Sequence, residues 1–207
     1  MKNNKTNDKI ENALLSLLQV KDINQVTIKE IAQKANVNRV TIYRHYNDKW
    51  DILEKIEEKF LHKLDVPHSK MILNLQLKTQ SPTESPDLTA LTDFLKVFQE
   101  NFSLLHILMG TNANLGFTNK LMTYLINLEI KSHPYTLLHM PKDKQEMFSY
   151  YSISALIGVI QYWRKHPKYS ALQIANFFFE ARVGAIKELE DNSLSLTNLD
   201  DSNNIQT

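Results

Sequence analysis

The segment TIKEIAQKANVNRVTIYRHYNDK, residues Thr27 to Lys49, decides the fold of the chain around it. Thr27 stands three residues before Glu30, which is the spacing of a capping box, in which a hydroxyl and a carboxylate satisfy the free N–H groups of a helix start. Apolar residues then recur at helical spacing: Ile28, Ile31, Ala32 and Ala35. We therefore expect a helix that begins at Thr27.

The end of this helix is marked by Asn36. After glycine, asparagine is the residue that best tolerates the left-handed conformation needed at a helix C-terminus. Asn38 can cap the next helix, which we expect to run from about Arg39 to Tyr46. Two helices joined by a turn of about three or four residues form a helix-turn-helix, whose second helix lies in the major groove of DNA.

Composition excludes several classes of protein. The chain has no cysteine, which excludes disulfides, thiol catalysis and cysteine-based zinc sites. It contains no paired histidine motif, no glycine-rich phosphate loop, no nucleophile elbow and no paired set of catalytic carboxylates. We therefore expect no enzymatic activity, no metal and no cofactor. The polar N-terminus and the lack of a long apolar window predict a cytoplasmic protein with no membrane span.

Charge is distributed unevenly along the chain. The first 64 residues carry 12 Lys and Arg against 9 Asp and Glu, and the remaining residues carry 12 against 14. This bias alone decides nothing, but its location is informative. Between positions 34 and 49 the chain has five basic residues and a single acidic residue, Asp48. These basic residues are Lys34, Arg39, Arg44, His45 and Lys49. A local basic face is the electrostatic signature of phosphate contact.

Helical periodicity extends over most of the chain, which has only 4 glycines and 6 prolines in 207 residues. We predict an all-α fold of about nine helices: an N-terminal three-helix helix-turn-helix domain (1–47), a connecting helix (48–66) that stops before Pro67, and a C-terminal helical bundle (67–207). The first helix is expected over 8–21. The Ser-, Thr- and Pro-rich stretch within 68–91 is expected to be a loop or linker. Glu57 interrupts an apolar face, and we interpret it as a solvated edge residue, with a paired switch group as the alternative.

The segment from Thr27 to Leu53 resembles the DNA-binding domain of the TetR family of transcriptional regulators. The resemblance rests on several elements of the family pattern: Thr27–Ile28, Ile31–Ala32, Ala35–Asn36–Val37, Thr41–Ile42–Tyr43, Tyr46 and Lys49. The departure from the pattern is Asn36, where the family usually has glycine. The C-terminal part resembles one subgroup of the family, which includes regulators of dihydroxyacetone metabolism. We take the second resemblance as a fold-level analogy and not as a ligand assignment.

The resemblance implies a set of DNA contacts, and physical reasons support each. Arg39 can bond two acceptors of a guanine, and Val40 and Thr41 are small enough to touch a thymine methyl. Tyr43 and His45 place donors at the edge of the groove, where phosphates lie. A cation at Lys49, in the first turn of a helix, opposes the helix dipole, which favours a phosphate contact over a helix-stabilising role. The predicted DNA-binding residues are Thr27, Lys29, Arg39, Val40, Thr41, Tyr43, His45 and Lys49.

The C-terminal region suggests a ligand pocket and a dimer interface, with ordinary core packing as the alternative for each residue named. Candidate pocket residues are large and apolar: Phe94, Phe98, Met109, Phe117, Tyr124, Tyr150 and Trp163. The last two predicted helices carry small residues, and in the family these helices pair across a two-fold axis. The predicted interface residues are Ala155, Gly158, Tyr162, Phe178, Ala181 and Ala185.

These expectations combine into a homodimeric regulator that binds a palindromic DNA operator. We predict a repressor that a small molecule releases or modulates at the C-terminal domain. The alternatives are a transcriptional coactivator or adaptor whose C-terminal domain binds a partner protein, and a small helical enzyme with an incidental helix-turn-helix. The absence of a catalytic constellation argues against the enzyme.

Overall fold

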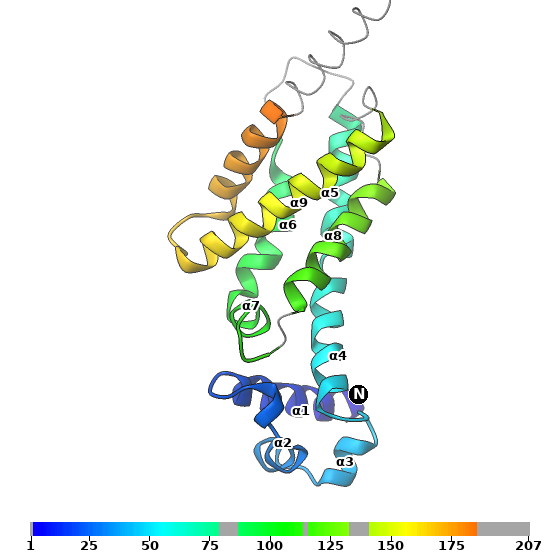
Figure 1. The fold of residues 1–207 in the computed structure, drawn as a ribbon, viewed down its shortest axis with the longest axis vertical. Coiled ribbons are helices and arrows are strands. Elements are labelled where there is room, and N and C mark those ends of the chain that lie inside the picture. Colours follow the sequence, from blue (N-terminus) through cyan, green and yellow to red (C-terminus); the bar gives the residue numbers. More distant parts are fainter. Residues whose placement is uncertain (1, 79–86, 114–115, 133–140, 186–207) are drawn as a thin grey trace, which may run out of the picture. The chain divides into compact units, whose positions relative to one another are not determined.

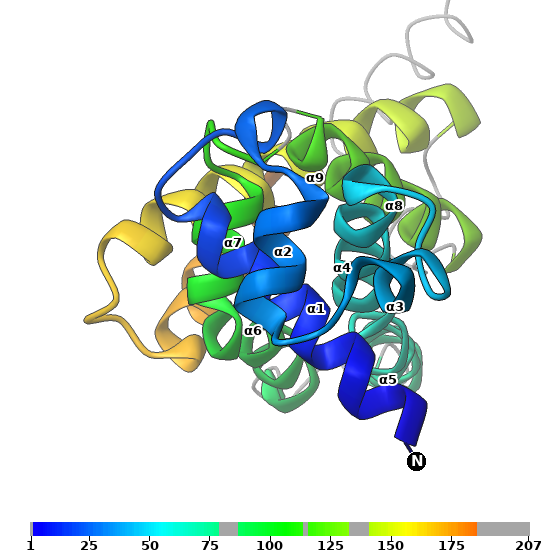
Figure 2. The same cartoon turned by 90° about the horizontal axis from the view of Figure 1, so that it is seen from below.

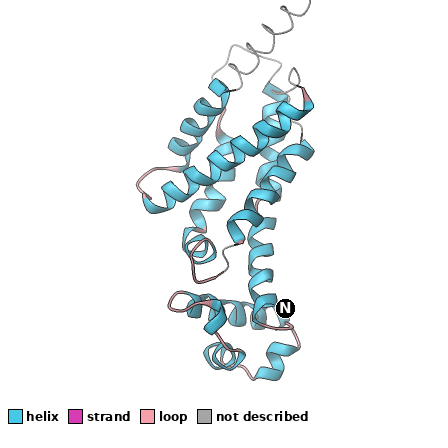
Figure 3. Cartoon of the chain, viewed as in Figure 1, coloured by secondary structure: helices cyan, strands magenta, loops and turns pink. Residues whose placement is uncertain are grey.

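The computed structural model describes residues 2–78, 87–113, 116–132 and 141–185, and all regular structure in these ranges is helical (Figures 1 and 3). The predicted all-α class is confirmed. The helices are α1 (Lys2–Leu18), α2 (Ile28–Ala35), α3 (Arg39–Tyr43), α4 (Lys49–His62), α5 (Asp65–Lys78), α6 (Thr89–Glu100), α7 (Phe102–Leu108), α8 (Phe117–Ser132) and α9 (Lys142–Lys165), with a short 3-10 helix η1 (Ile23–Gln25) and a last helix over 171–185.

The chain forms two compact units. The first comprises Met1–Leu64 and Glu100–Leu121, and the second comprises Asp65–Gln99 and Met122–Thr207. The core of the first unit is apolar and fully buried, with Ile31 and Ile42 from the helix-turn-helix and Phe117 from the start of α8. The core of the second is built on Phe94, Phe98 and Trp163. The division into domains at residues 47 and 66 stays a prediction, because the compact units take residues 100–121 together with the N-terminal helices.

The predicted capping signals of the helix-turn-helix are all present. The Thr27 hydroxyl accepts from the Glu30 N–H, and the Glu30 carboxylate accepts from the Thr27 N–H at 2.9 Å, which completes the capping box. Asn36 has φ 53° and ψ 49°, the left-handed conformation expected for it. The Asn38 side chain accepts from the Thr41 N–H at 2.8 Å. Helix α1 packs on α2, and α2 packs on α3 (Figure 2).

Helix α5 is the main correction to the predicted elements. The connecting helix was expected to continue to residue 66 and a loop to follow, but α4 ends at His62 and a new helix begins at Asp65. Pro67 is the third residue of α5. Proline is tolerated in the first turn of a helix because the N–H that it lacks would have no partner there. The predicted linker is therefore helical up to Lys78, and residues 79–86 lie outside the described residues.

Two further differences concern helix ends. Helix α1 spans Lys2–Leu18 and not 8–21, and the segment after it forms η1, which Asp22 caps. Helix α7 ends before Gly110, which has no positive φ. A Cβ at this glycine would lie 2.8 Å from the His106 carbonyl oxygen. Close packing, and not a left-handed turn, is therefore what requires glycine at this position.

Candidate nucleic-acid interface

Helix α3 exposes large apolar side chains. Val40 is 60% exposed and Tyr43 is 59% exposed, whereas Ile42 between them is fully buried. Arg39 at the start of the helix is also exposed. Single exposed apolar residues are normal, whereas exposed apolar residues grouped on one face mark interaction sites. Because Ile42 is buried while Val40 and Tyr43 are exposed, this short helix has an outer face on which these two side chains lie beside the cation of Arg39.

Thr41 and His45 are half-buried on the same segment. The Thr41 hydroxyl donates to the Asn38 side chain at 3.3 Å, beside the bond from its own N–H. The His45 ring lies 6.4 Å from the ring of Tyr46. Thr41 therefore stabilises the start of α3, in addition to its predicted contact with DNA.

Lys49 has a structural role that its position in the sequence did not reveal. Its ammonium donates to the carbonyl oxygens of Asn24 and Val26, both at 2.8 Å. These carbonyls lie at the end of η1, so Lys49 ties the start of α4 to the segment that leads into α2. A lysine ammonium has three donors, so one remains for a phosphate. The predicted phosphate contact stays a prediction, but the unfavourable helix dipole is offset within the protein itself.

Thr27 and Lys29 lie at the start of α2, and both are exposed. The Thr27 hydroxyl is engaged by Glu30, donating to its carboxylate at 2.8 Å. Glu30 also forms an ion pair with Lys21. This contact, followed by the hydrogen bonds from Thr27, lowers the pKa of Glu30 to about 2. Thr27 therefore positions the helix, while Lys29 offers its charge to solvent.

A buried polar cluster lies behind the helix-turn-helix. Tyr46 is 4% exposed, and its hydroxyl donates to a Glu11 carboxylate oxygen at 2.7 Å. Lys59 donates to both oxygens of the same carboxylate at 2.7 Å. Burial, and then the hydrogen bond to Glu11, raise the pKa of Tyr46. The cluster joins α1, the end of the recognition segment and α4, and sequence reasoning missed it because its members are far apart in the chain.

The structure does not gather the predicted pocket residues at one place. Phe94, Phe98 and Trp163 are buried in the second unit, and the Trp163 indole N–H donates to the Tyr169 carbonyl at 2.7 Å. Tyr150 is 49% exposed. Tyr124 donates its hydroxyl to Asp65. The two remaining candidates belong to the first unit: Met109 is half-buried, and Phe117 packs edge-on against Phe60 with ring centroids 6.1 Å apart.

The interior of the second unit holds polar groups that sequence reasoning did not select. The Arg182 guanidinium pairs with the Glu129 carboxylate, which is 5% exposed, and also donates to the Ser152 hydroxyl. His68 is 4% exposed, and burial lowers its pKa. Its ring lies edge-on to Phe94, with centroids 6.0 Å apart. Helical periodicity gave no sign of the buried His68, because this residue lies on α5, where no helix was expected.

The predicted dimer residues separate into two groups. Ala155, Gly158 and Tyr162 are exposed on one face of α9, and Ala181 is exposed on the last helix. Phe178, by contrast, is 8% exposed and packs in the core, whereas its neighbour Phe177 is 59% exposed. In the protomer, Phe178 is therefore a core residue, and Phe177 is the more accessible of the two rings.

Neither a metal centre nor a membrane span is found within the described part of the chain. No group of three or more His, Cys, Asp or Glu side chains that could hold a metal ion occurs there. No helix there is long and apolar enough to cross a membrane.

Comparisons with known proteins identify the class. The profile of bacterial regulatory proteins of the tetR family matches residues 10–56, and a profile described as transcriptional regulator C-terminal region matches residues 88–187. Together with the helix-turn-helix, these matches define a DNA-binding transcriptional regulator. The chain belongs to the TetR family of bacterial regulatory proteins.

Individual relatives share part of the sequence or the fold. The uncharacterized helix-turn-helix regulator YxbF of Bacillus subtilis strain 168 is 47% identical over 49 residues, which are 24% of this chain and 13% of that protein. The solved structure of NalD, the secondary repressor of the MexAB-OprM multidrug efflux pump in Pseudomonas aeruginosa, has a TM-score of 0.62 at 20% identity, covering 88% of this chain and 96% of that one. The dihydroxyacetone kinase operon activator DhaS has a TM-score of 0.59 at 16% identity, with the same coverage. These two structural likenesses show the fold alone.

Proposed function

We propose that this protein is a homodimeric repressor that binds a palindromic double-stranded DNA operator in the cytoplasm and is released by a small molecule, with no enzymatic activity. The observation that carries the proposal is the outer face of α3, where Val40 and Tyr43 are exposed beside Arg39. A monomer gains nothing from this exposure, whereas the major groove offers thymine methyls, guanine acceptors and phosphates to the same three side chains.

The roles of the contact residues follow from their chemistry. Arg39 bonds the two acceptors of a guanine, and Val40 packs on a thymine methyl. Tyr43 and His45 donate to phosphates at the groove edge. Lys29 and the remaining donor of Lys49 supply phosphate contacts outside the recognition helix, and Thr27 and Thr41 hold the two helix starts in position.

Dimerisation is supported by an exposed face of the second unit. On α9, Met147, Tyr151 and Tyr162 are exposed by 62%, 61% and 51%, and they share one side of the helix at intervals of four and eleven residues. Gly158 on the same side has open space where a Cβ would lie. The last helix also exposes an aromatic ring, that of Phe177, and is linked to α9 by the hydrogen bond from Arg182 to Ser152. Two recognition helices about 34 Å apart then read two half-sites.

An effector site in the second unit is supported by buried polar groups near aromatic rings. The Thr92 hydroxyl is buried and has no hydrogen-bond partner among the described residues. His68 is buried, and its lowered pKa favours the neutral imidazole, which can donate and accept at once. A buried hydroxyl without a partner is costly, and a ligand that satisfies Thr92 would bind with specificity. Repression is the usual outcome in the family, although the fold relatives include the activator DhaS.

The DNA-binding role is tested by titrating promoter DNA from the protein's own locus against single variants. We expect Tyr43→Ala and Arg39→Ala each to weaken binding by about 5- to 100-fold, in line with one lost base or phosphate contact. Thermal stability should not change, because both side chains are exposed. Lys55→Ala is the matched control, since it removes an exposed cation that pairs with Glu58 on α4.

Equal DNA affinity of parent, Tyr43→Ala and Arg39→Ala would overturn the proposed interface. Lys49→Ala serves a separate purpose, because it removes two hydrogen bonds to backbone carbonyls. We expect this variant to lose stability as well as DNA affinity. If it lost affinity alone, the structural role of Lys49 would be wrong.

If the C-terminal domain instead served as a coactivator or adaptor, the parent dimer would bind a partner protein and would not bind the operator. The titration distinguishes this alternative directly, since the adaptor needs no intact face on α3.

A further inference from the structure

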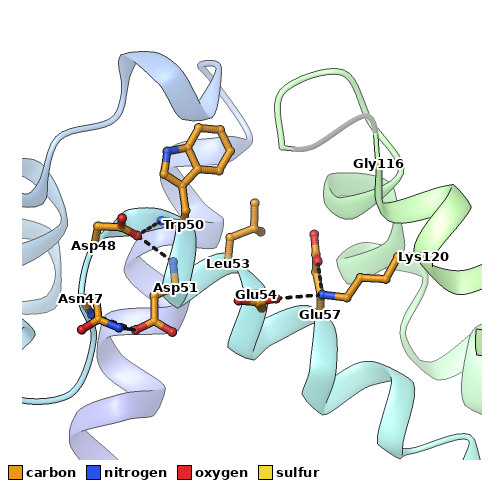
Figure 4. Close-up of a pocket in the computed structure, with 9 residues that line it drawn as sticks. All are labelled: Asn47, Asp48, Trp50, Asp51, Leu53, Glu54, Glu57, Gly116 and Lys120. Atoms are coloured by element: carbon orange, nitrogen blue, oxygen red, sulfur yellow. Dashed lines mark hydrogen bonds and ion pairs between the residues drawn. The ribbon is translucent and has the colours of Figure 1, made fainter.

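A cleft of about 470 Å³ lies in the first unit along one side of α4 (Figure 4). It runs from the cap of α4 to the middle of the helix and is bordered by Gly116 and the first turn of α8. Its lining residues are Asn47, Asp48, Trp50, Asp51, Leu53, Glu54, Glu57, Gly116 and Lys120. A cleft of this volume is within the range of small-molecule sites.

The lining is strongly acidic, with four carboxylates and a single ammonium. Two of the carboxylates are engaged by backbone groups at the helix start: Asp48 accepts from the N–H groups of Trp50 and Asp51, and Asp51 accepts from Asn47. Glu54 is exposed and lies 3.6 Å from the Lys120 ammonium. The excess of negative charge favours a cation over an anion as the occupant.

Glu57 supplies an independent reason to expect a ligand. It is 3% exposed, and the expectation of a solvated edge residue is therefore wrong. Its Oε2 accepts from the Lys120 ammonium at 3.1 Å, but its Oε1 is buried and has no hydrogen-bond partner among the described residues. Figure 4 shows the Glu57 and Glu54 side chains reaching toward Lys120. A buried carboxylate oxygen without a donor is costly, and a ligand N–H would satisfy it.

We propose that this cleft binds a small organic cation with N–H donors, of the diamine or polyamine class. One ammonium bonds to Glu57 Oε1, which no donor of the described residues reaches, and a second lies toward the exposed Glu54 carboxylate. A metal ion fits less well, because no group of three or more ligating side chains suited to one occurs in the described ranges, and hard cations require about six or more oxygen ligands. An amine needs only one or two well-placed acceptors.

The cleft also borders the DNA-binding segment. Asn47 and Asp48 line it and immediately follow Tyr46, whose hydroxyl anchors the recognition segment to Glu11. A cation held between α4 and the first turn of α8 would stabilise one position of α4. An effect of the cation on operator affinity rests on the proposed function, whereas binding of the cation does not.

The binding is tested by isothermal titration of the full chain with putrescine and with spermidine at 150 mM NaCl. We expect saturable binding that Glu57→Gln weakens at least tenfold and Glu54→Gln weakens about threefold, because a second, exposed carboxylate is screened by salt. Lys120→Met should tighten binding, because the ligand then no longer shares the Glu57 carboxylate. Glu58→Gln is the matched control, since Glu58 is a neighbouring acid on α4 that does not line the cleft.

Glu54 is exposed, so its variant tests the site even if Glu57→Gln fails to fold. Equal weakening by Glu58→Gln would show general attraction to an acidic helix and overturn the site. The absence of saturable binding in the parent would also overturn it, as would binding of inorganic phosphate in place of the amines. Because these titrations contain no DNA, a failure of the cation site and a failure of operator binding are recorded separately.

Discussion

Tyr46 and Glu11 show how a single buried contact holds the recognition segment in place. The Glu11 carboxylate is almost inaccessible, yet it accepts from both Tyr46 and Lys59. A buried charge is tolerated only when it is paired and hydrogen-bonded. The two donors satisfy this requirement, one from the segment between α3 and α4 and the other from within α4.

Removing the Tyr46 hydroxyl is expected to destabilise the protein. Tyr46→Phe keeps the ring but deprives a buried carboxylate of one donor, and we expect the free energy of unfolding to fall by about 1–3 kcal/mol. Chemical denaturation measures the change. Tyr43→Phe is the matched control, because the Tyr43 side chain is largely exposed, and it should be neutral. Equal losses in the two variants would contradict the role of the Glu11 contact.

Glu30 gives a prediction about pH. Its pKa is lowered from 4.5 to about 2 in the folded protein, chiefly through Lys21. A carboxylate whose folded pKa is depressed contributes stability above its unfolded pKa, and that contribution is lost as the pH falls through the folded value. Glu30→Gln keeps an acceptor for the capping box but removes the charge. We expect the variant to be less stable than the parent at pH 6 and equal to it near pH 2, as measured by thermal melting at each pH. A stability difference that does not change between these pH values would contradict this assignment.

At the scale of elements, the turn between α2 and α3 depends on one backbone conformation. Asn36 is the single non-glycine residue with positive φ within the described ranges. Side chains with a Cβ pay about 1–2 kcal/mol in this conformation, and asparagine pays less because it hydrogen-bonds locally. The angle between the two helices therefore rests on a residue that contacts no DNA in our assignment.

Substitution of Asn36 tests this dependence. We expect Asn36→Gly to be neutral or slightly stabilising in the folded state, because glycine enters the left-handed region without strain. Asn36→Ala should cost about 1 kcal/mol. Operator affinity should follow the same order, since a strained turn reorients α3. If both variants had the same melting temperature as the parent, the conformation of this turn would not limit the stability of the protein.

For the whole molecule, the second unit carries the surface that we propose joins two copies of the chain and so brings two DNA-binding segments together. Gly158 and Gly184 both have open space where a Cβ would lie, so the single chain does not require glycine at either position. A partner helix that packs closely there would instead leave no room for a large side chain. The exposed rings of Tyr162 and Phe177 add aromatic surface on the same two helices.

Gly158→Arg is expected to convert the dimer into monomers. The side chain fits the isolated protomer but obstructs a closely packed partner helix, and we expect the dimer dissociation constant to rise at least tenfold. Light scattering coupled to size-exclusion chromatography measures the mass, and operator binding should fall with it. Gly158→Ala is the control and should remain dimeric. An unchanged mass for Gly158→Arg would place the interface elsewhere.

The adjacent residues Phe177 and Phe178 separate interface from core. Phe177→Ala should weaken the dimer with little effect on the fold of the protomer. Phe178→Ala should instead destabilise the protomer by about 3–5 kcal/mol, because it leaves a cavity in the core. Under this assignment, Phe177→Ala lowers the mass measured in solution with little change in denaturation, whereas Phe178→Ala lowers the free energy of unfolding. A weakened dimer from the Phe178 variant, with unchanged stability, would restore the original prediction for that residue.

The capping box at Thr27, the left-handed Asn36 and the cap at Asn38 were predictable because each is decided within about four residues of chain. Helical class followed from periodicity for the same reason. Helix α5 was not predicted, because its Pro67 reads as a helix end in the sequence and as a permitted first-turn residue in the structure. Phe177 and Phe178 are equivalent in composition, and only the packing of the last helix assigns one to the core.

Lys49 and Glu57 depend on contacts between residues far apart in the chain. The partners of Lys49 lie 23 and 25 residues away, and the partner of Glu57 lies 63 residues away. Whether a charge is free for DNA, locked to a carbonyl or buried beside a cleft is set by the neighbours that folding brings to it, and no local pattern records them. The recognition segment was therefore legible in the residues from Thr27 to Lys49 alone, whereas the anchoring of that segment and the acidic cleft behind it exist only once α1, α4 and α8 have come together.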